Sequence, residues 1–377
     1  MKKIAILGGG ISGLYFANLL EKNQNYNYKI FERKSDFERN DGYGIQLSVN
    51  SIKLLNEVGF SNVEAHLLSF PKKAIFYDAK SLNKICDIDI SKFNYENNRY
   101  STLKRSTLLN FLLNNIPEKK VKFNSELSSL SFDDKINLKF SDNNEEIFDY
   151  AIISDGVFSK TKSIVLNKDV RPKYFNSVAL RGSIKNLASN DISLYLGSNF
   201  HFVIYPVNQN KEFNFISIIR KNLSKEQIND QNYFKKNEFI KTLISEISLK
   251  TSFKLEDKIE NLKSFPIFTS NSFKKPEKKN IFLVGDALYT FPPSFAQGAS
   301  QSIESSKEAY DEIENKTDNY YTKRNERIKK VNFRSILNNS IFHLSNPFTV
   351  FVRNKFLKYL SKNNNFLENY LGKIYKN

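Results

Sequence analysis

Short apolar runs that end in glycine recur along this chain. The run Ile4–Leu7 leads into the glycines of residues 8–13, and runs at 150–154 and 281–284 lead into Asp155-Gly156 and Gly285-Asp286. Apolar runs of this length are typical of parallel strands that are buried on both faces. We therefore predict three strands of one buried sheet, at the start, in the middle and near residue 285.

Between these runs, the pattern either alternates or takes a helical period. Alternation predicts a mixed or antiparallel sheet with one covered face, with strands near 74–77, 85–90, 178–184, 193–196, 200–207 and 213–220. A small antiparallel meander is predicted over 121–124, 127–132 and 136–140. The spacing predicts helices over 14–21, 51–58, 106–114, 227–246 and 299–313, and a helical, aromatic and basic tail over 320–375.

This order of elements predicts an α/β fold with two interwoven domains. A discontinuous, Rossmann-like nucleotide-binding domain takes residues 1–70, 100–175 and 265–330. A substrate domain built on the mixed β-sheet takes residues 71–99 and 176–264, and C-terminal helices take residues 331–377.

The first apolar run continues into Gly8-x-Gly10-x-x-Gly13. Gly8 allows a tight turn, Gly10 lets backbone approach a pyrophosphate, and Gly13 lets the next helix pack closely on the sheet. Glu32 follows a second predicted strand, 19 residues beyond Gly13, where an acid can bind an adenosine ribose. We favour a dinucleotide site over a glycine-rich turn without a ligand, and the motif alone does not separate NAD from FAD.

The charge of the chain is strongly basic. The 377 residues include 57 Lys and Arg against 40 Asp and Glu, a net charge of +17. No nucleic-acid partner is predicted, because the lysines are scattered and form no basic stripe. The excess charge favours anionic substrates or anionic lipid surfaces instead.

The cysteine and histidine content limits the chemistry further. Cys86 is the single cysteine, so no disulfide can form within the chain, which favours a reducing, cytoplasmic compartment. No metal cluster is expected from Cys86 and the well-separated His66, His201 and His343. We expect neither a signal peptide nor a membrane-spanning segment.

The three glycine-containing motifs, in this order, resemble the signatures of the single-component, group A FAD-dependent aromatic monooxygenases. The likeness covers residues 1 to about 345 and is closest to the salicylate and hydroxybenzoate hydroxylase branch. Three further segments resemble that branch: Gly44-Ile45-Gln46-Leu47-Ser48-x-Asn50, Arg181-Gly182 and Tyr205-Pro206-Val207.

The resemblance implies FAD as cofactor and NAD(P)H and O₂ as co-substrates. The implied reaction hydroxylates a small phenolic substrate through a flavin C4a-hydroperoxide. The cofactor-binding residues that it implies are Gly8, Gly10, Ser12, Gly13, Glu32, Arg33, Gln46, Arg105, Asp155, Gly156, Gly285, Asp286, Gly298 and Ala299. The chain departs from the family pattern twice: Lys162 replaces an Arg of the second signature, and Tyr289 replaces a His near the third.

His201, Tyr205 and Pro293 are the predicted catalytic residues. Residues 201 and 205 share one face of a strand, where the branch has a His and a Tyr that line the substrate. His201 would take the phenol proton. Arg181 is the candidate counter-ion for a substrate carboxylate. The alternatives are a sheet histidine, a core tyrosine and a structural arginine.

Three other functions stay open at this point. They are a membrane-associated hydroxylase of a quinone precursor, a flavoprotein reductase, and a basic nucleotide- or nucleic-acid-binding protein. For the tail, we favour a helical cover on the nucleotide-binding domain over a basic membrane-surface helix, so only weak peripheral membrane association is considered. We expect a monomer or a homodimer.

Overall fold

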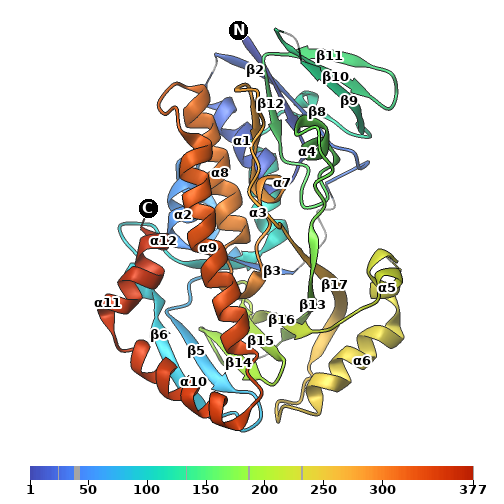
Figure 1. Cartoon of the computed structure of the whole chain (residues 1–377). Coiled ribbons are helices and arrows are strands. Elements are labelled where there is room, and N and C mark those ends of the chain that lie inside the picture. Colours follow the sequence, from blue (N-terminus) through green and yellow to red (C-terminus); the bar gives the residue numbers. More distant parts are fainter. Residues whose placement is uncertain (24, 38–42, 133, 186, 231, 377) are drawn as a thin grey trace.

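A parallel five-stranded sheet forms the upper part of the molecule in Figure 1. The structure is a computed structural model and describes residues 1–376 except 24, 38–42, 133, 186 and 231. The three predicted apolar runs lie side by side in this sheet, which confirms the predicted α/β class. The strand order is β18 (Ile281–Leu283), β12 (Tyr150–Ile153), β1 (Lys2–Leu7), β2 (Tyr26–Phe31) and β8 (Val121–Lys122).

Helices cover this sheet and bury its apolar strands. The side chains of Ile4, Ile6, Leu14 and Phe16 are fully buried in one cluster. Asn18 on the first helix donates to the carbonyl oxygen of Leu112 at 2.8 Å and joins two of the helices. The helices are α1 (Ile11–Glu21), α2 (Val49–Asn56), α3 (Arg105–Asn114), α4 (Lys160–Val165), α7 (Gly285–Leu288) and α8 (Gly298–Ile313).

The predicted meander is correct in two of its three segments. Val121–Lys122 does not join it, because these residues pair in parallel with Ile30–Phe31 of β2. The chain then turns through Asn124, whose φ is +52°. The meander itself consists of β9 (Leu127–Phe132), β10 (Ile136–Phe140) and β11 (Glu145–Phe148).

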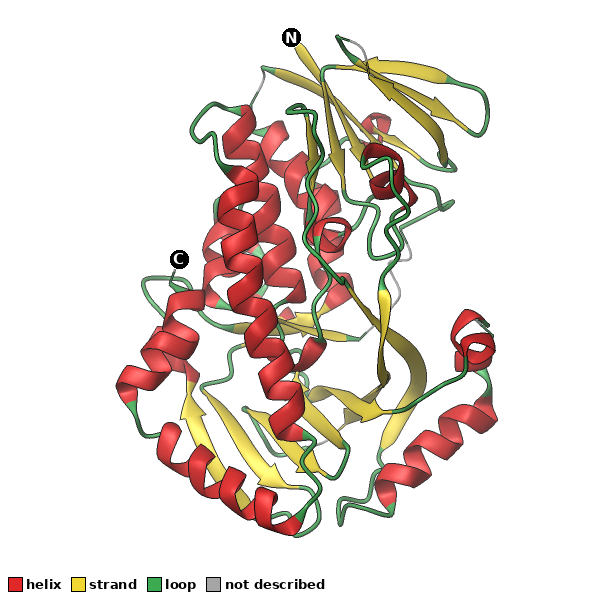
Figure 2. Cartoon of the chain, viewed as in Figure 1, coloured by secondary structure: helices red, strands yellow, loops and turns green. Residues whose placement is uncertain are grey.

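A seven-stranded mixed sheet forms the lower part of the molecule (Figure 2). Its strands come from distant parts of the chain, and β14 pairs in parallel with β5 while the other neighbours are antiparallel. The order is β17 (Ile259–Thr269), β13 (Lys173–Lys185), β16 (Glu212–Arg220), β15 (Phe200–Pro206), β14 (Ile192–Gly197), β5 (Lys73–Asp78) and β6 (Lys84–Asp89).

A small antiparallel sheet lies between the two large ones. Gly44 pairs with Lys104, and the backbone N–H of Gly44 donates to Oδ1 of Asn214 on β16 at 2.6 Å. This contact ties the small sheet to the seven-stranded one. Its strands are β3 (Gly44–Leu47), β7 (Ser101–Lys104) and β4 (Leu68–Ser69). Short helical turns elsewhere are η1 (Phe60–Asn62) beside α2, η2 (Ala65–Leu67) beside β4, η3 (Ile90–Phe93) beside β5 and η4 (Glu118–Lys120) beside β2.

The helix predicted over 227–246 is broken in the structure. Helix α5 (Lys225–Asn229) ends at Asp230, whose Oδ1 accepts from the backbone N–H of Asn232. Such local bonds compete with the helix. Residue 231 lies outside the described residues. The turn η5 (Tyr233–Lys235) and helix α6 (Asn237–Ser248) follow, and α6 packs on one face of the seven-stranded sheet.

The C-terminal helices lie mainly on the seven-stranded sheet, so the expected cover on the nucleotide-binding region is only partly correct. Helix α9 (Tyr320–Phe342) packs on α8 near its start and reaches the lower sheet at its end (Figure 1). Helix α10 (Pro347–Leu360) lies against β6. The chain ends in α11 (Asn364–Leu367), the π-helical turn η7 (Glu368–Gly372) and α12 (Lys373–Tyr375). None of the described helices is both long and apolar enough to cross a bilayer.

Candidate active site

The glycine turn between β1 and α1 is closed on one side and open on the other. The φ of Gly8 is +107°, a conformation that favours glycine and lets the chain turn sharply out of β1. A Cβ at Gly13 would lie 2.2 Å from the carbonyl oxygen of Gly8, so only glycine lets α1 pack this closely. A Cβ at Gly10 would meet no protein atom nearer than the carbonyl oxygen of Ser154, at 4.0 Å. Gly10 and the N-terminus of α1 therefore face space that a phosphate group can occupy.

Glu32 lies beside this turn, directly after β2. Its Oε2 accepts from the backbone N–H of Gly9 at 2.9 Å, and its Oε1 accepts from the N–H of Lys34 at 3.1 Å. These two bonds hold the carboxylate next to the glycine turn, where a dinucleotide places its ribose. The neighbouring Arg33 is exposed.

Asp286 and the N-terminus of helix α8 face a large cavity that lies between the five-stranded and the seven-stranded sheet. A Cβ at Gly285 would lie 2.6 Å from Oγ of the buried Ser12, so the start of α7 approaches α1 closely. Asp286 is exposed to the cavity, and the cavity walls around it raise the pKa of its carboxyl above the ordinary value. Helix α8 begins at Gly298 and Ala299, which also line the cavity, and a Cβ at Gly298 would meet nothing within 4 Å.

In the Asp155-Gly156 turn after β12, one carboxylate oxygen is left without a hydrogen-bond donor in the described part of the chain. Oδ1 of Asp155 is buried and has no hydrogen-bond partner in the described part of the chain, and burial raises the pKa of this carboxyl. Gly156 has a φ of +85° with open space around it. Nζ of Lys162 donates to the carbonyl oxygen of Leu288 at 3.0 Å, and burial lowers the pKa of Lys162 to about 8.

One face of the seven-stranded sheet forms the floor of the cavity, which has a volume of about 770 Å³. Residues that pair across neighbouring strands share a face of the sheet. The registers place one row of lining residues across six strands, and this row comprises Arg181, Ile216, Val203, Leu194, Phe76 and Cys86. The opposite face carries Phe202 and Phe215 and is covered by α6.

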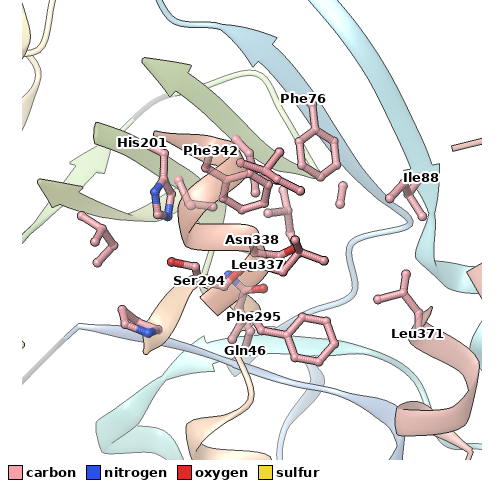
Figure 3. Close-up of a pocket in the computed structure, with 18 of the residues that line it drawn as sticks. Gln46, Phe76, Ile88, His201, Ser294, Phe295, Leu337, Asn338, Phe342 and Leu371 are labelled. Carbon is pink, nitrogen blue, oxygen red and sulfur yellow. Dashed lines mark hydrogen bonds between the residues drawn. The ribbon is translucent and has the colours of Figure 1, made fainter. Parts of the chain in front are cut away.

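His201 and Tyr205 lie on the cavity side of β15, as the strand period predicts. Nδ1 of His201 lies 2.8 Å from Nε2 of His343, which caps the end of α9. Burial lowers the pKa of His201 well below its ordinary value, and burial also lowers the pKa of His343 to about 3. The pair is therefore neutral at pH 7, with one ring N–H shared between the two nitrogens. Figure 3 shows His201 beside Phe342 at one wall of the cavity.

Arg181 and a group of polar side chains line the cavity between the two large sheets. The guanidinium of Arg181 lies 4.4 Å from the ring centre of Tyr43, a cation–π contact. The hydroxyl of Tyr100 donates to Oε1 of Gln46 at 2.7 Å. Tyr205 is buried beside them, and burial raises the pKa of its phenol. These groups place a fixed cation and several hydrogen-bonding groups in a cavity that is otherwise apolar.

The remaining predicted residues occupy different places. Pro293 begins the turn η6 (Pro293–Phe295), which lines the cavity. Tyr289 is buried, and its ring packs on Phe291 at 5.1 Å between centres. Arg105 opens α3 and is half-buried, and its backbone N–H donates to the carbonyl oxygen of Tyr43.

The C-terminal segment supplies cavity residues that the sequence analysis did not identify. The end of α9 contributes Asn338 and Phe342 (Figure 3). The last turns of the chain contribute Tyr370 and Tyr375. No local motif marks these residues. The period-two spacing of Ala74 with Phe76 and of Cys86 with Ile88 is a signal that could have identified the strand residues of the floor.

Comparisons with known proteins agree with this geometry. A family model described as "FAD binding domain" matches residues 1–313. The 6-hydroxynicotinate 3-monooxygenase of Bordetella bronchiseptica is 22% identical over 320 residues, which are 80% of this chain and 80% of that protein. A salicylate hydroxylase of Pseudomonas putida is 23% identical over 237 residues, which are 57% of this chain and 54% of that one. The structure of Klebsiella pneumoniae HpxO complexed with FAD and uric acid is 17% identical and has a TM-score of 0.77, covering 95% of this chain and 93% of that chain.

Proposed function

The chain belongs to the FAD-binding domain family and is an FAD-dependent monooxygenase, and we propose that it uses NAD(P)H and O₂ to hydroxylate a phenolic ring in the large cavity. The observation that carries the proposal is the continuity of this cavity. Asp286 and Gly298 line one end of it, and Arg181, His201 and Tyr205 line the floor. A ring held over the floor would therefore lie next to the cofactor.

FAD fits the residues that would hold it. Gly10 and Gly298 leave open approaches, and Asp155 and Asp286 present carboxylate oxygens that a ligand hydroxyl or amide could satisfy. Glu32 would hold the adenosine ribose, and the N-terminus of α1 would face the pyrophosphate. FAD, when bound, supplies the redox chemistry of hydride acceptance and oxygen activation. The N–H groups at the start of α8 would stabilise negative charge that develops nearby.

The floor residues would bind and orient the substrate. Arg181 offers a fixed positive charge to a carboxylate or phenolate. His201 is neutral, so one of its ring nitrogens can accept a hydrogen bond from a substrate hydroxyl while the other contacts His343. The apolar walls exclude water from the reacting ring. In this arrangement His201 accepts the hydrogen bond of the phenol as the ring becomes electron-rich, and its lowered pKa means that the proton is shared along this bond rather than fully transferred.

The test compares His201→Ala with His343→Ala. The first variant removes the proposed hydrogen-bond acceptor, and the second removes only its partner. His201→Ala should bind FAD and oxidise NAD(P)H, with hydroxylation reduced by about 10²–10⁴-fold and peroxide released instead. His343→Ala should keep most of the coupling. The measurement is product formed per NAD(P)H consumed, with a panel of phenolic acids as substrates. Equal coupling in wild type and His201→Ala would remove His201 from the site.

A second candidate is a hydroxylase of a lipophilic aromatic substrate at a membrane surface. A specific observation favours it, namely the exposed aromatic residues of α10 beside the cavity. Uptake of O₂ with NAD(P)H separates both hydroxylases from a flavoprotein reductase. The oligomeric state, which we propose is a monomer or a homodimer, is measured by light scattering.

A further inference from the structure

Helix α10 leaves an apolar face uncovered. Of the twelve large apolar side chains exposed in the described part of the chain, five lie on this helix of 14 residues, so the exposure is concentrated there. Their spacing places them on one side of the helix. Monomeric proteins rarely expose such a continuous patch without a partner. The five are Phe348 (73% exposed), Phe351 (61%), Val352 (47%), Phe356 (56%) and Tyr359 (66%).

The charged residues that surround this apolar face in the sequence are all basic. No Asp or Glu occurs between Glu326 and Glu368. Lys355 and Lys358 are exposed on α10, and Nζ of Lys355 lies 5.6 Å from the ring centre of Phe351. Lysine stems can lie along an apolar surface while the ammonium groups reach outward to anionic headgroups.

The same helix forms part of the cavity wall. Phe348, Val352 and Phe356 are exposed and also line the cavity. The cavity therefore reaches the surface at the apolar face of α10. Its volume of about 770 Å³ includes the end at Asp286 and Gly298 that the cofactor would occupy, and the rest extends as far as these side chains of α10.

We infer that α10 docks the protein on an anionic lipid surface and that the cavity receives a lipophilic aromatic substrate from that surface. The substrate part rests on the proposed function, and the docking part does not. A second copy of the chain fits the patch less well. A two-fold interface would bring Lys355 and Lys358 of both copies together, and like charges in close contact repel.

The experiment measures flotation of the FAD-loaded protein with vesicles. Vesicles of equal phosphatidylglycerol and phosphatidylcholine should carry the protein, and pure phosphatidylcholine vesicles should carry much less. Phe351→Ser with Tyr359→Ser removes apolar contacts without touching cavity residues, and should lower the bound fraction at least tenfold. Lys355→Gln with Lys358→Gln should lower it by about fivefold per lysine on anionic vesicles.

The matched control is Lys241→Gln on α6 with Leu249→Ser directly after it, because both residues are exposed and neither lines the cavity. This control should float like wild type, and FAD content verifies the fold of every variant. Absence of flotation in low salt, or equal flotation of the α10 and α6 variants, overturns the docking. So does a wild-type dimer that the Phe351→Ser and Tyr359→Ser changes convert to a monomer without lipid binding.

A separate arm tests the substrate part. NAD(P)H oxidation is compared between a simple phenol and the same phenol carrying a long alkyl chain, supplied in the anionic vesicles. Greater stimulation by the alkylated phenol supports the inference, and greater stimulation by the simple phenol overturns it. If the protein floats but neither phenol stimulates oxidation, the proposed function fails while the docking stands.

Discussion

Replacement of Gly10 by valine should weaken cofactor binding without destabilising the chain. The backbone of Gly10 has φ −80° and ψ −176°, which valine can adopt, and a Cβ there lies 4.0 Å from its nearest protein neighbour. The FAD-free variant should therefore unfold within about 0.5 kcal/mol of the FAD-free wild type. The new side chain occupies the approach of the pyrophosphate. Crowding between this side chain and FAD destabilises only the FAD-bound form, by about 1–3 kcal/mol. This corresponds to about 5–150-fold weaker binding.

Gly13→Ala is the matched control, because it puts a smaller side chain on the closed side of the same turn. Its Cβ would lie 2.2 Å from the carbonyl oxygen of Gly8 and 2.6 Å from Oγ of Ser154. The backbone carbonyl cannot move aside without shifting the turn, so about 1–3 kcal/mol is lost from folding itself.

The assay is urea unfolding of the FAD-free proteins, combined with FAD titration followed by quenching of flavin fluorescence. Gly10→Val should raise the Kd for FAD and leave the urea midpoint of unfolding unchanged. Gly13→Ala should lower that urea midpoint. Wild-type FAD affinity in Gly10→Val would refute the assignment of the open side to the pyrophosphate. An unchanged midpoint in Gly13→Ala would refute the steric argument for the closed side.

Two titrating groups of the site give further predictions. The cavity walls raise the pKa of Asp286 from the ordinary 3.8 to about 6, so between these pH values the folded, FAD-free chain binds a proton that the unfolded chain has lost. Its stability should fall as pH rises from about 4 to 6, and urea unfolding of Asp286→Asn should lack that fall. Burial lowers the pKa of Lys162 from 10.5 to about 8, so stability should rise between pH 8 and 10.5 in wild type but not in Lys162→Met. A pH dependence identical to wild type in either variant would contradict the corresponding shift.

The elements that the sequence predicted well are those whose cause is local. The turn after Ile4–Leu7 needs a positive φ at Gly8 and close packing at Gly13, and both requirements are visible as glycines. The strand period likewise placed His201 and Tyr205 on one face before any pairing was known. The assignment of Val121–Lys122 to the meander was wrong because their pairing depends on a distant segment. Two residues carry too little pattern to reveal that their partner is β2, about ninety residues earlier in the chain.

The tail shows why the cavity itself could not be derived from periodicity. Its helical pattern gives an apolar face but not the surface on which that face lies. In the structure, Phe342 packs with Phe76 and Leu196, which belong to two separate strands, and the same placement brings His343 to His201. These contacts join segments of the chain that share no local signal. The substrate end of the site therefore depends on how the last two helices settle on the seven-stranded sheet, whereas the cofactor end depends on turns that each carry their own glycines.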